Sequence, residues 1–161
     1  MSWGTDDVIK GVVHSREHFL KHLKGISAEQ WTWKPYPECN SIVETVAHLI
    51  ADDRSALGTF MTGGEPDYAG SQELERDPEK LLKIFAAGHA ELTAFLKAKY
   101  GSTPLETEVS VWGFPMKLGQ AITFLSSEDY YHAGQIAFIR MATDPAWDYY
   151  AAIYEDFSLP G

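Results

Sequence analysis

Four long segments of this chain repeat apolar residues every three or four positions, which is the spacing of one face of an α-helix. The first segment shows the pattern most fully, with Ile9, Val12, Val13, Phe19, Leu20 and Leu23 on one side. Such a face is buried against other helices, because exposing it to water is unfavourable. The pattern therefore predicts a fold in which long helices pack on one another.

Capping residues mark where these helices begin and end. Ser41 and Glu44 have the spacing of a capping box, in which each side chain bonds the backbone N–H of the other residue. Asp77 is expected as the N-cap of a further helix, with Pro78 in its first turn. The long helices are expected over residues 5–24, 41–61, 77–101 and 116–141.

The connections between these helices add smaller elements. The stretch SAEQWTWKPYPECN predicts a short turn of helix and then an extended link broken by prolines. The stretch TEVSVWGFPMKL predicts a small hairpin, with Trp112, Gly113 and Phe114 in a turn that packs on the bundle or covers a pocket mouth. A short terminal helix is expected over residues 147–157. Together these elements predict an all-α four-helix bundle in one domain over residues 1–161.

The charge balance limits the partners of the chain. It has 13 basic and 23 acidic residues, for a formal charge of −10. Such a surface repels nucleic acid backbones and anionic lipids, so we expect neither nucleic acid nor membrane partners. Cys39 is the only cysteine, which excludes an internal disulfide. The N-terminal residues lack a signal-peptide pattern and no apolar run is long enough to span a bilayer, so we expect a soluble, cytoplasmic protein.

The stretch EDYYHAGQIAFIR on the last long helix carries the main candidate for chemistry. Glu128 and His132 are four residues apart, which places their Cβ atoms roughly 5–6 Å apart on one helix face. His48, in the stretch SIVETVAHLI on the second long helix, is a third residue of metal-ligand type. Two helices can therefore bring three ligands together with space for water or substrate. The alternative is a core pair in which Glu128 accepts a hydrogen bond from His132.

Other polar residues have simpler explanations. Asp53 lies near the centre of its helix's apolar face, where it orients a ligand imidazole, binds substrate or, as we favour, pairs with an arginine of a neighbouring helix. Asp129 is expected at the opposite edge of the His132 face from Glu128. His89 has no acidic or histidine partner one turn away and is expected to be structural. A solvated face of the first helix is expected to carry His14, His18 and His22.

The residues around His132 have expected roles of their own. Gly134 is expected to let its helix approach a neighbour closely. Gln135 is expected to bond Glu128 or to line the edge of the bundle. For Tyr131 we expect aromatic packing, with proton donation as the alternative, and Tyr130 is expected at the surface or in a subunit contact.

The sequence lacks the motifs of several familiar kinds of site. The sequence has no glycine-rich nucleotide-binding motif, no G-x-S-x-G and no H-E-x-x-H. A ferritin-like di-iron centre needs two Glu-x-x-His motifs, whereas this chain offers a single Asp129-x-x-His132.

Three stretches together resemble the DinB/YfiT-like superfamily of bacterial four-helix bundles: EQWTWKPYPECNSI, SIVETVAHLI and HAGQIAFIR. The resemblance covers nearly the whole chain. In that family, one histidine of the second long helix and a pair at i, i+4 on the fourth hold a divalent metal ion. The matching residues here are His48, Glu128 and His132. Glu128 stands where a histidine is usual, and this His-Glu-His set is similar to that of mycothiol-dependent maleylpyruvate isomerases.

The resemblance implies a metal-dependent enzyme acting on a small-molecule substrate. Two imidazoles and a carboxylate suit zinc, with nickel as another candidate. Relatives use the metal with a low-molecular-weight thiol such as bacillithiol or mycothiol, which implies S-transferase activity. The alternatives are a metal-dependent hydrolase and a non-catalytic protein that binds a metal or a small molecule. The resemblance also implies a homodimer, which would use exposed aromatic residues such as Trp147, Tyr149 and Tyr150.

Overall fold

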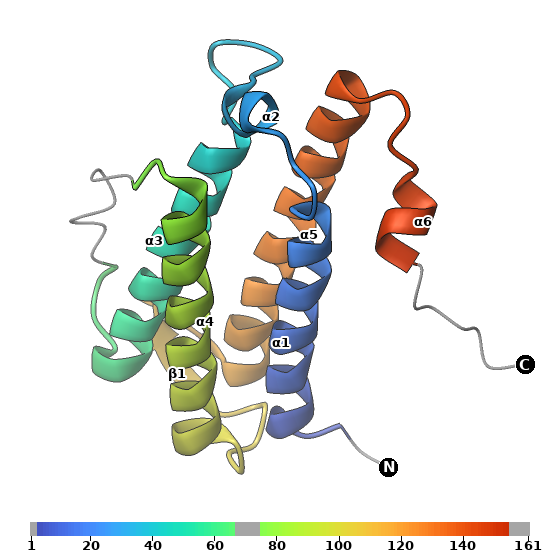
Figure 1. Ribbon diagram of the computed structural model, residues 1–161. Helices are drawn as coiled ribbons and strands as arrows, with labels where there is room; N and C mark the ends of the chain where they lie inside the picture. The colour runs from blue at the N-terminus through green and yellow to red at the C-terminus, as the bar shows by residue number, and fades with distance from the viewer. Residues whose placement is uncertain (1–2, 67–74, 155–161) are drawn as a thin grey trace, which may run out of the picture.

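The computed structural model describes residues 3–66 and 75–154, and within them the chain is mostly helical (Figure 1). The helices are α1 (Thr5–His22), α2 (Ala28–Thr32), α3 (Ile42–Thr62), α4 (Pro78–Tyr100), α5 (Leu118–Thr143) and α6 (Tyr149–Tyr154). Two short strands, β1 (Glu108–Val111) and β2 (Phe114–Lys117), form a hairpin directly before α5. The all-α fold, the hairpin and the short terminal helix predicted from the sequence are therefore confirmed.

The capping residues lie where the sequence predicts them. The Ser41 N–H donates to Glu44 Oε2 at 2.8 Å, which completes the capping box of α3. Asp77 Oδ1 accepts a hydrogen bond from the Lys80 N–H at 3.0 Å at the start of α4. α3 ends at Gly63, whose φ of 72° is a left-handed conformation that glycine adopts without a Cβ clash.

The long helices pack around a shared interior (Figure 1). α1 lies along α5, α3 lies along α4, and α2 crosses one end of the bundle. α3 and α5 also contact each other, but less extensively than either of those pairs. The hairpin packs on α3 and α5 at the end of the bundle away from α2. The hairpin therefore lies at one end of the contact between α3 and α5.

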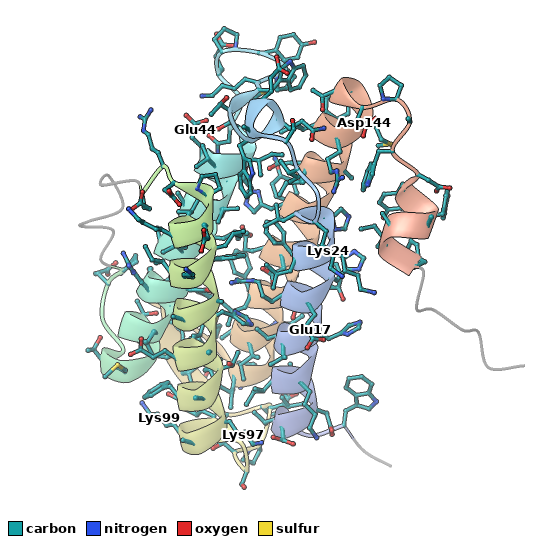
Figure 2. The ribbon with its side chains drawn as sticks, in the orientation of Figure 1. Glu17, Lys24, Glu44, Lys97, Lys99 and Asp144 are labelled. Carbon is teal, nitrogen blue, oxygen red and sulfur yellow. The ribbon has the colours of Figure 1, made fainter. Side chains whose placement is uncertain are left out.

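The apolar interior falls into two clusters, and Figure 2 shows the side chains that fill the space between the helices. The cluster at the α2 end contains Phe19, Trp31, Ile42, Phe85 and Ile136, among others. The cluster at the hairpin end contains Val12, Phe60, Leu92, Val111 and Ile122, among others. Buried polar residues of α1, α3 and α5 lie at the chain positions between the two clusters. The bundle thus has a polar layer at mid-height.

The segment that contains α6 covers part of α1, so one prediction about α1 is wrong. His22 is only 1% exposed, because its ring lies against those of Trp147 and Tyr149. His14 is exposed and His18 half-buried, so the predicted solvated histidine face is wrong at His22. The sequence pattern identified the face but not the terminal segment that covers it. The expected continuation of this terminal helix to residue 157 lies outside the described residues.

No helix within residues 3–66 and 75–154 combines the length and the apolar character needed to cross a bilayer.

Candidate metal centre

The structure brings the three predicted ligands together. His48 is on α3, Glu128 and His132 are one turn apart on α5, and each offers a donor atom within 4.8 Å of the other two. His132 is buried, Glu128 is half-buried and His48 is the most exposed of the three. His132 Nε2 lies 3.5 Å from Glu128 Oε2, and the rings of His48 and His132 have centroids 5.0 Å apart. The site therefore lies where α3 faces α5.

Gln135 fixes the ring of His132. His132 Nδ1 lies 2.7 Å from Gln135 Oε1, one turn along α5. When Nδ1–H donates this hydrogen bond, the lone pair of Nε2 faces Glu128. The prediction that Gln135 bonds Glu128 is therefore wrong in its partner, because the side chain bonds the histidine three residues before it.

Asp52 is a member of this group that the sequence analysis missed. Its Oδ2 lies 3.1 Å from His48 Nε2, one turn along α3. Burial raises the pKa of Asp52; His48 opposes the rise, whereas the nearby Glu128 carboxylate adds to it. The spacing of four residues from His48 was a usable signal, since residues at i, i+4 share a helix face.

A pocket of about 630 Å³ opens beside these residues. Its polar lining includes His48, Asp52 and Glu128. The apolar lining comes from α3, α5 and the hairpin, and consists of Leu49, Trp112, Phe114, Met116, Phe124 and Leu125. A pocket of this size accommodates a small molecule. The turn packs on the bundle, as predicted, because Trp112 lies against Phe60, and Trp112 and Phe114 also line the pocket.

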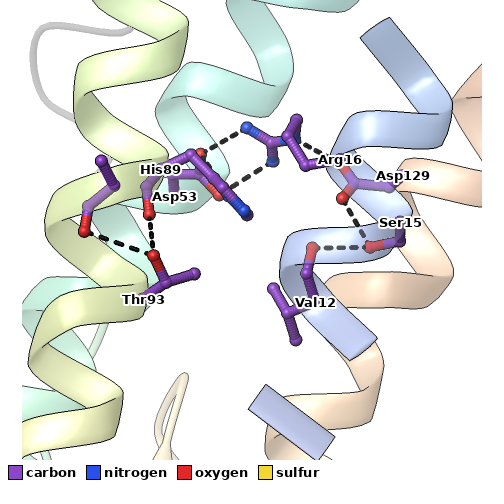
Figure 3. A network of polar contacts seen from close by, with 8 residues as sticks. Val12, Ser15, Arg16, Asp53, His89, Thr93 and Asp129 are labelled. Atoms are coloured by element: carbon purple, nitrogen blue, oxygen red, sulfur yellow. Dashed lines mark hydrogen bonds and ion pairs between the residues drawn. The ribbon is translucent and has the colours of Figure 1, made fainter. Parts of the chain in front are cut away.

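A second polar cluster lies deeper, centred on Arg16 of α1 (Figure 3). The Arg16 guanidinium donates to both carboxylate oxygens of Asp53, at 2.8 and 3.1 Å, and through Nε to Asp129 Oδ1 at 2.8 Å. Ser15 Oγ donates to the other oxygen of Asp129 at 2.8 Å. The preferred prediction for Asp53, an arginine of a neighbouring helix, is confirmed. Asp129 was expected at the edge of the face but is 0% exposed.

The electrostatics of this cluster are set by burial and by Arg16. Burial disfavours the charged form of Asp53, but His89 and Arg16 outweigh it, so the pKa of Asp53 lies below its usual value. Burial raises the pKa of Asp129, although Arg16 and Ser15 oppose the rise. His89 Nδ1 lies 3.6 Å from Asp53 Oδ2, too far for a hydrogen bond, so its influence is electrostatic. His89 is buried, and neither of its ring nitrogens has a hydrogen-bond partner among the described residues, so its predicted structural role stays a prediction.

The other residues near His132 have smaller roles. A Cβ on Gly134 would meet nothing within 4 Å, so the prediction that this glycine permits a close helix approach is wrong. The exposed ring of Tyr131 lies 5.0 Å from that of His132. Tyr130 is exposed and its ring lies 5.3 Å from that of His18.

The chemistry of the donor set fits a divalent cation. Two imidazoles and one carboxylate are the ligand types that zinc and nickel accept in proteins. Their donor atoms are already gathered within 4.8 Å, and Gln135 and Asp52 contact the two imidazoles as outer-shell partners of metal-ligating histidines commonly do. The cluster around Arg16 differs from this donor set, because the guanidinium already occupies lone pairs of the Asp53 and Asp129 carboxylates.

The family assignment follows from the same segments. The DinB superfamily model matches residues 12–136, a range that includes the whole of α3 and the residues of α5 that carry Glu128 and His132. The chain belongs to the DinB superfamily. No curated protein and no solved structure matched the chain. The superfamily and the gathered His-Glu-His group fit a metal-dependent function.

Proposed function

We propose that His48, Glu128 and His132 hold a divalent metal ion, most simply zinc, and that the chain transfers a low-molecular-weight thiol to a small electrophile. The convergence of their donor atoms within 4.8 Å carries the proposal, since the three residues come from two helices 80 residues apart in sequence. Membership in the DinB superfamily supports it. Bound at this position, a divalent cation lowers the pKa of a thiol and so supplies a thiolate at neutral pH.

The residues of the chain prepare the site for this chemistry. Gln135 holds the His132 ring so that one nitrogen is available and the other is engaged. The buried position of His132 excludes water from one side of the site, while the pocket leaves the side of His48 and Glu128 accessible. A thiol and an electrophile can therefore meet beside the ligands and not inside the bundle.

Metal content tests the proposed ligands. Zinc equilibrated with the purified chain and measured after gel filtration is expected at one ion per chain in the wild type. His132→Ala is expected to lose it, and His14→Ala, an exposed histidine on α1, is expected to retain it. Unchanged zinc in His132→Ala would reject the proposed ligand set.

The reaction is tested separately. Conjugation of chlorodinitrobenzene to bacillithiol or mycothiol is expected to require the chain, to stop after chelation and to fail in Glu128→Gln. Zinc binding without thiol conjugation would instead support the non-catalytic alternative, and ester hydrolysis without thiol would support the hydrolase. A homodimer stays a prediction, which sedimentation of the wild type can test.

A further inference from the structure

The pocket beside the candidate ligands has an apolar wall on the hairpin side. Phe124 precedes Glu128 by one turn of α5, in the direction of the hairpin, so the two share a helix face. Phe114 of β2 lines the same pocket, together with Trp112 from the turn. The wall therefore adjoins the site that we propose for the metal.

Trp112 has an unusual backbone conformation. Its φ is 54° and that of Gly113 is 76°, so both central residues of the two-residue turn are left-handed. Hairpin turns of this kind favour Asn-Gly, because a bulky residue at the first position is strained. The ring of Trp112 lies 5.2 Å from that of Phe124, in an edge-to-face arrangement. Strain of this kind persists where the surroundings hold it and often marks a functional site.

Part of the apolar wall is exposed. Phe114 is 66% exposed and Phe124 is 51% exposed, although both line the pocket. Large aromatic surfaces next to a pocket are typical of sites that bind an apolar group. Rings arranged in this way bind another ring by offset or edge-to-face contact.

Away from the proposed metal ion, the described part of the lining offers no free cation to an anionic electrophile. Arg16 is the cation among the described lining residues, and Asp53 and Asp129 already engage it. Asp52 is acidic and repels phosphates and carboxylates. The occupant suited to this lining is uncharged.

We infer that the pocket binds the electrophile of the reaction, an uncharged molecule with an aromatic body that packs on Trp112, Phe114 and Phe124. This inference rests on the proposed function for its reaction step. With an aryl halide, the sulfur–carbon bond forms as the carbon–halogen bond breaks. The halide leaves with the bonding electron pair, and the proton of the thiol passes to the buffer.

A binding experiment tests the wall without relying on turnover. N-phenylnaphthylamine, an uncharged aromatic probe, is titrated into the full chain and followed by its fluorescence. Phe124→Ala and Trp112→Asn are expected to weaken binding roughly tenfold or more, because each removes an aromatic surface. Tyr130→Ala, an exposed aromatic residue of α5 outside this pocket, is the control and is expected to bind as the wild type does.

Trp112→Asn separates binding from folding. Asparagine adopts positive φ readily, which offsets part of the packing lost against Phe60, so the melting temperature is expected to change little while probe binding falls. Equal affinity in both variants and the wild type, or an equal loss in Tyr130→Ala, would overturn the inference.

The two proposals fail in different ways. Probe binding that persists in His132→Ala supports the wall even where the metal proposal has failed. Conversely, a chain that conjugates thiols with the same preference for chlorodinitrobenzene over iodoacetamide in the wild type and in Phe124→Ala would sink the inference and leave the proposed function intact.

Discussion

Residues 52–53 of α3 and residues 128–129 of α5 supply two polar clusters that differ in their partners. The second residue of each pair turns into the bundle, where Arg16 bonds both carboxylates. The first residue of each pair faces the pocket, where the described residues that pair with them are His48 and His132. Adjacent positions on the same two helices thus contribute to different chemistry.

The difference shows which partner leaves the donor atoms of an acidic cluster free to bind a metal ion from solution. The inner cluster consists of Arg16, Asp53 and Asp129. Its guanidinium is always charged and takes up the carboxylate lone pairs. The outer cluster consists of His48, Asp52, Glu128 and His132. Because imidazoles bind metals in their neutral form, this cluster keeps donor atoms available beside its carboxylates. The inner cluster is accordingly expected to control stability, and the outer one ligand binding.

Loss of the inner cation is expected to have the largest effect. Arg16→Met leaves two buried carboxylates without their partner and is expected to lower the free energy of unfolding by about 3–5 kcal/mol. Urea denaturation measures the change. Arg54→Met, an exposed arginine of α3, is the control, and a similar effect in both variants would contradict the role assigned to the inner cluster.

Loss of the hydrogen bond to His132 is expected to act on the outer cluster alone. Gln135→Ala frees the ring to rotate and is expected to weaken zinc binding by about 10–100-fold, with little change in stability without metal. Competition with a coloured chelator measures the affinity. Thr123→Ala, at an exposed position of the same helix, should bind zinc normally; if it matched Gln135→Ala, the hydrogen bond would not be the cause.

Neutralising adjacent acids is expected to separate the clusters directly. In the presence of chelator, Asp129→Asn weakens the bonding of Arg16 and is expected to lower the free energy of unfolding by about 1–3 kcal/mol. Glu128→Gln relieves repulsion with Asp52 and is expected to change it by less than about 0.5 kcal/mol. Denaturation curves of the two variants provide the comparison, and the reverse order would refute it.

An effect of pH is expected where α1 contacts the C-terminal segment, which lies outside both clusters. Burial lowers the pKa of His22 to about 4, below its ordinary value of 6.5. The unfolded chain therefore binds this proton first, and stability falls as pH decreases from about 6.5 towards 4.

Between pH 7 and pH 5 this histidine is expected to cost about 2 kcal/mol of stability. His22→Gln cannot titrate, so its stability should fall less over this range, as followed by thermal melting. His14→Gln is the control for a histidine that is exposed, and a parallel loss in the wild type and His22→Gln would exclude His22 as the source.

The helix boundaries could be predicted because they depend on local hydrogen bonds. Ser41 and Asp77 each bond a backbone N–H three residues away, so a short stretch of sequence contains both partners. The environment of His22 depends on a segment more than 120 residues later. A helical wheel shows which residues share a face, but not which distant element covers that face.

The candidate site divides in the same way. Glu128 and His132 were predictable from their spacing, whereas His48 was a candidate on another helix that the family resemblance matched to the same ligand set. Asp52 could have been found from its spacing to His48. Arg16 could not, since its role requires knowing that its side chain reaches from α1 to Asp53 on α3 and to Asp129 on α5.

The arrangement of the two clusters also limits which insertions and deletions the gene can accept. Removing one residue from the interior of α3 or α5 would rotate the rest of that helix by about 100°. The carboxylate that should meet the guanidinium would then turn elsewhere. We therefore expect length variation among close homologues to be absent from the middle of these helices.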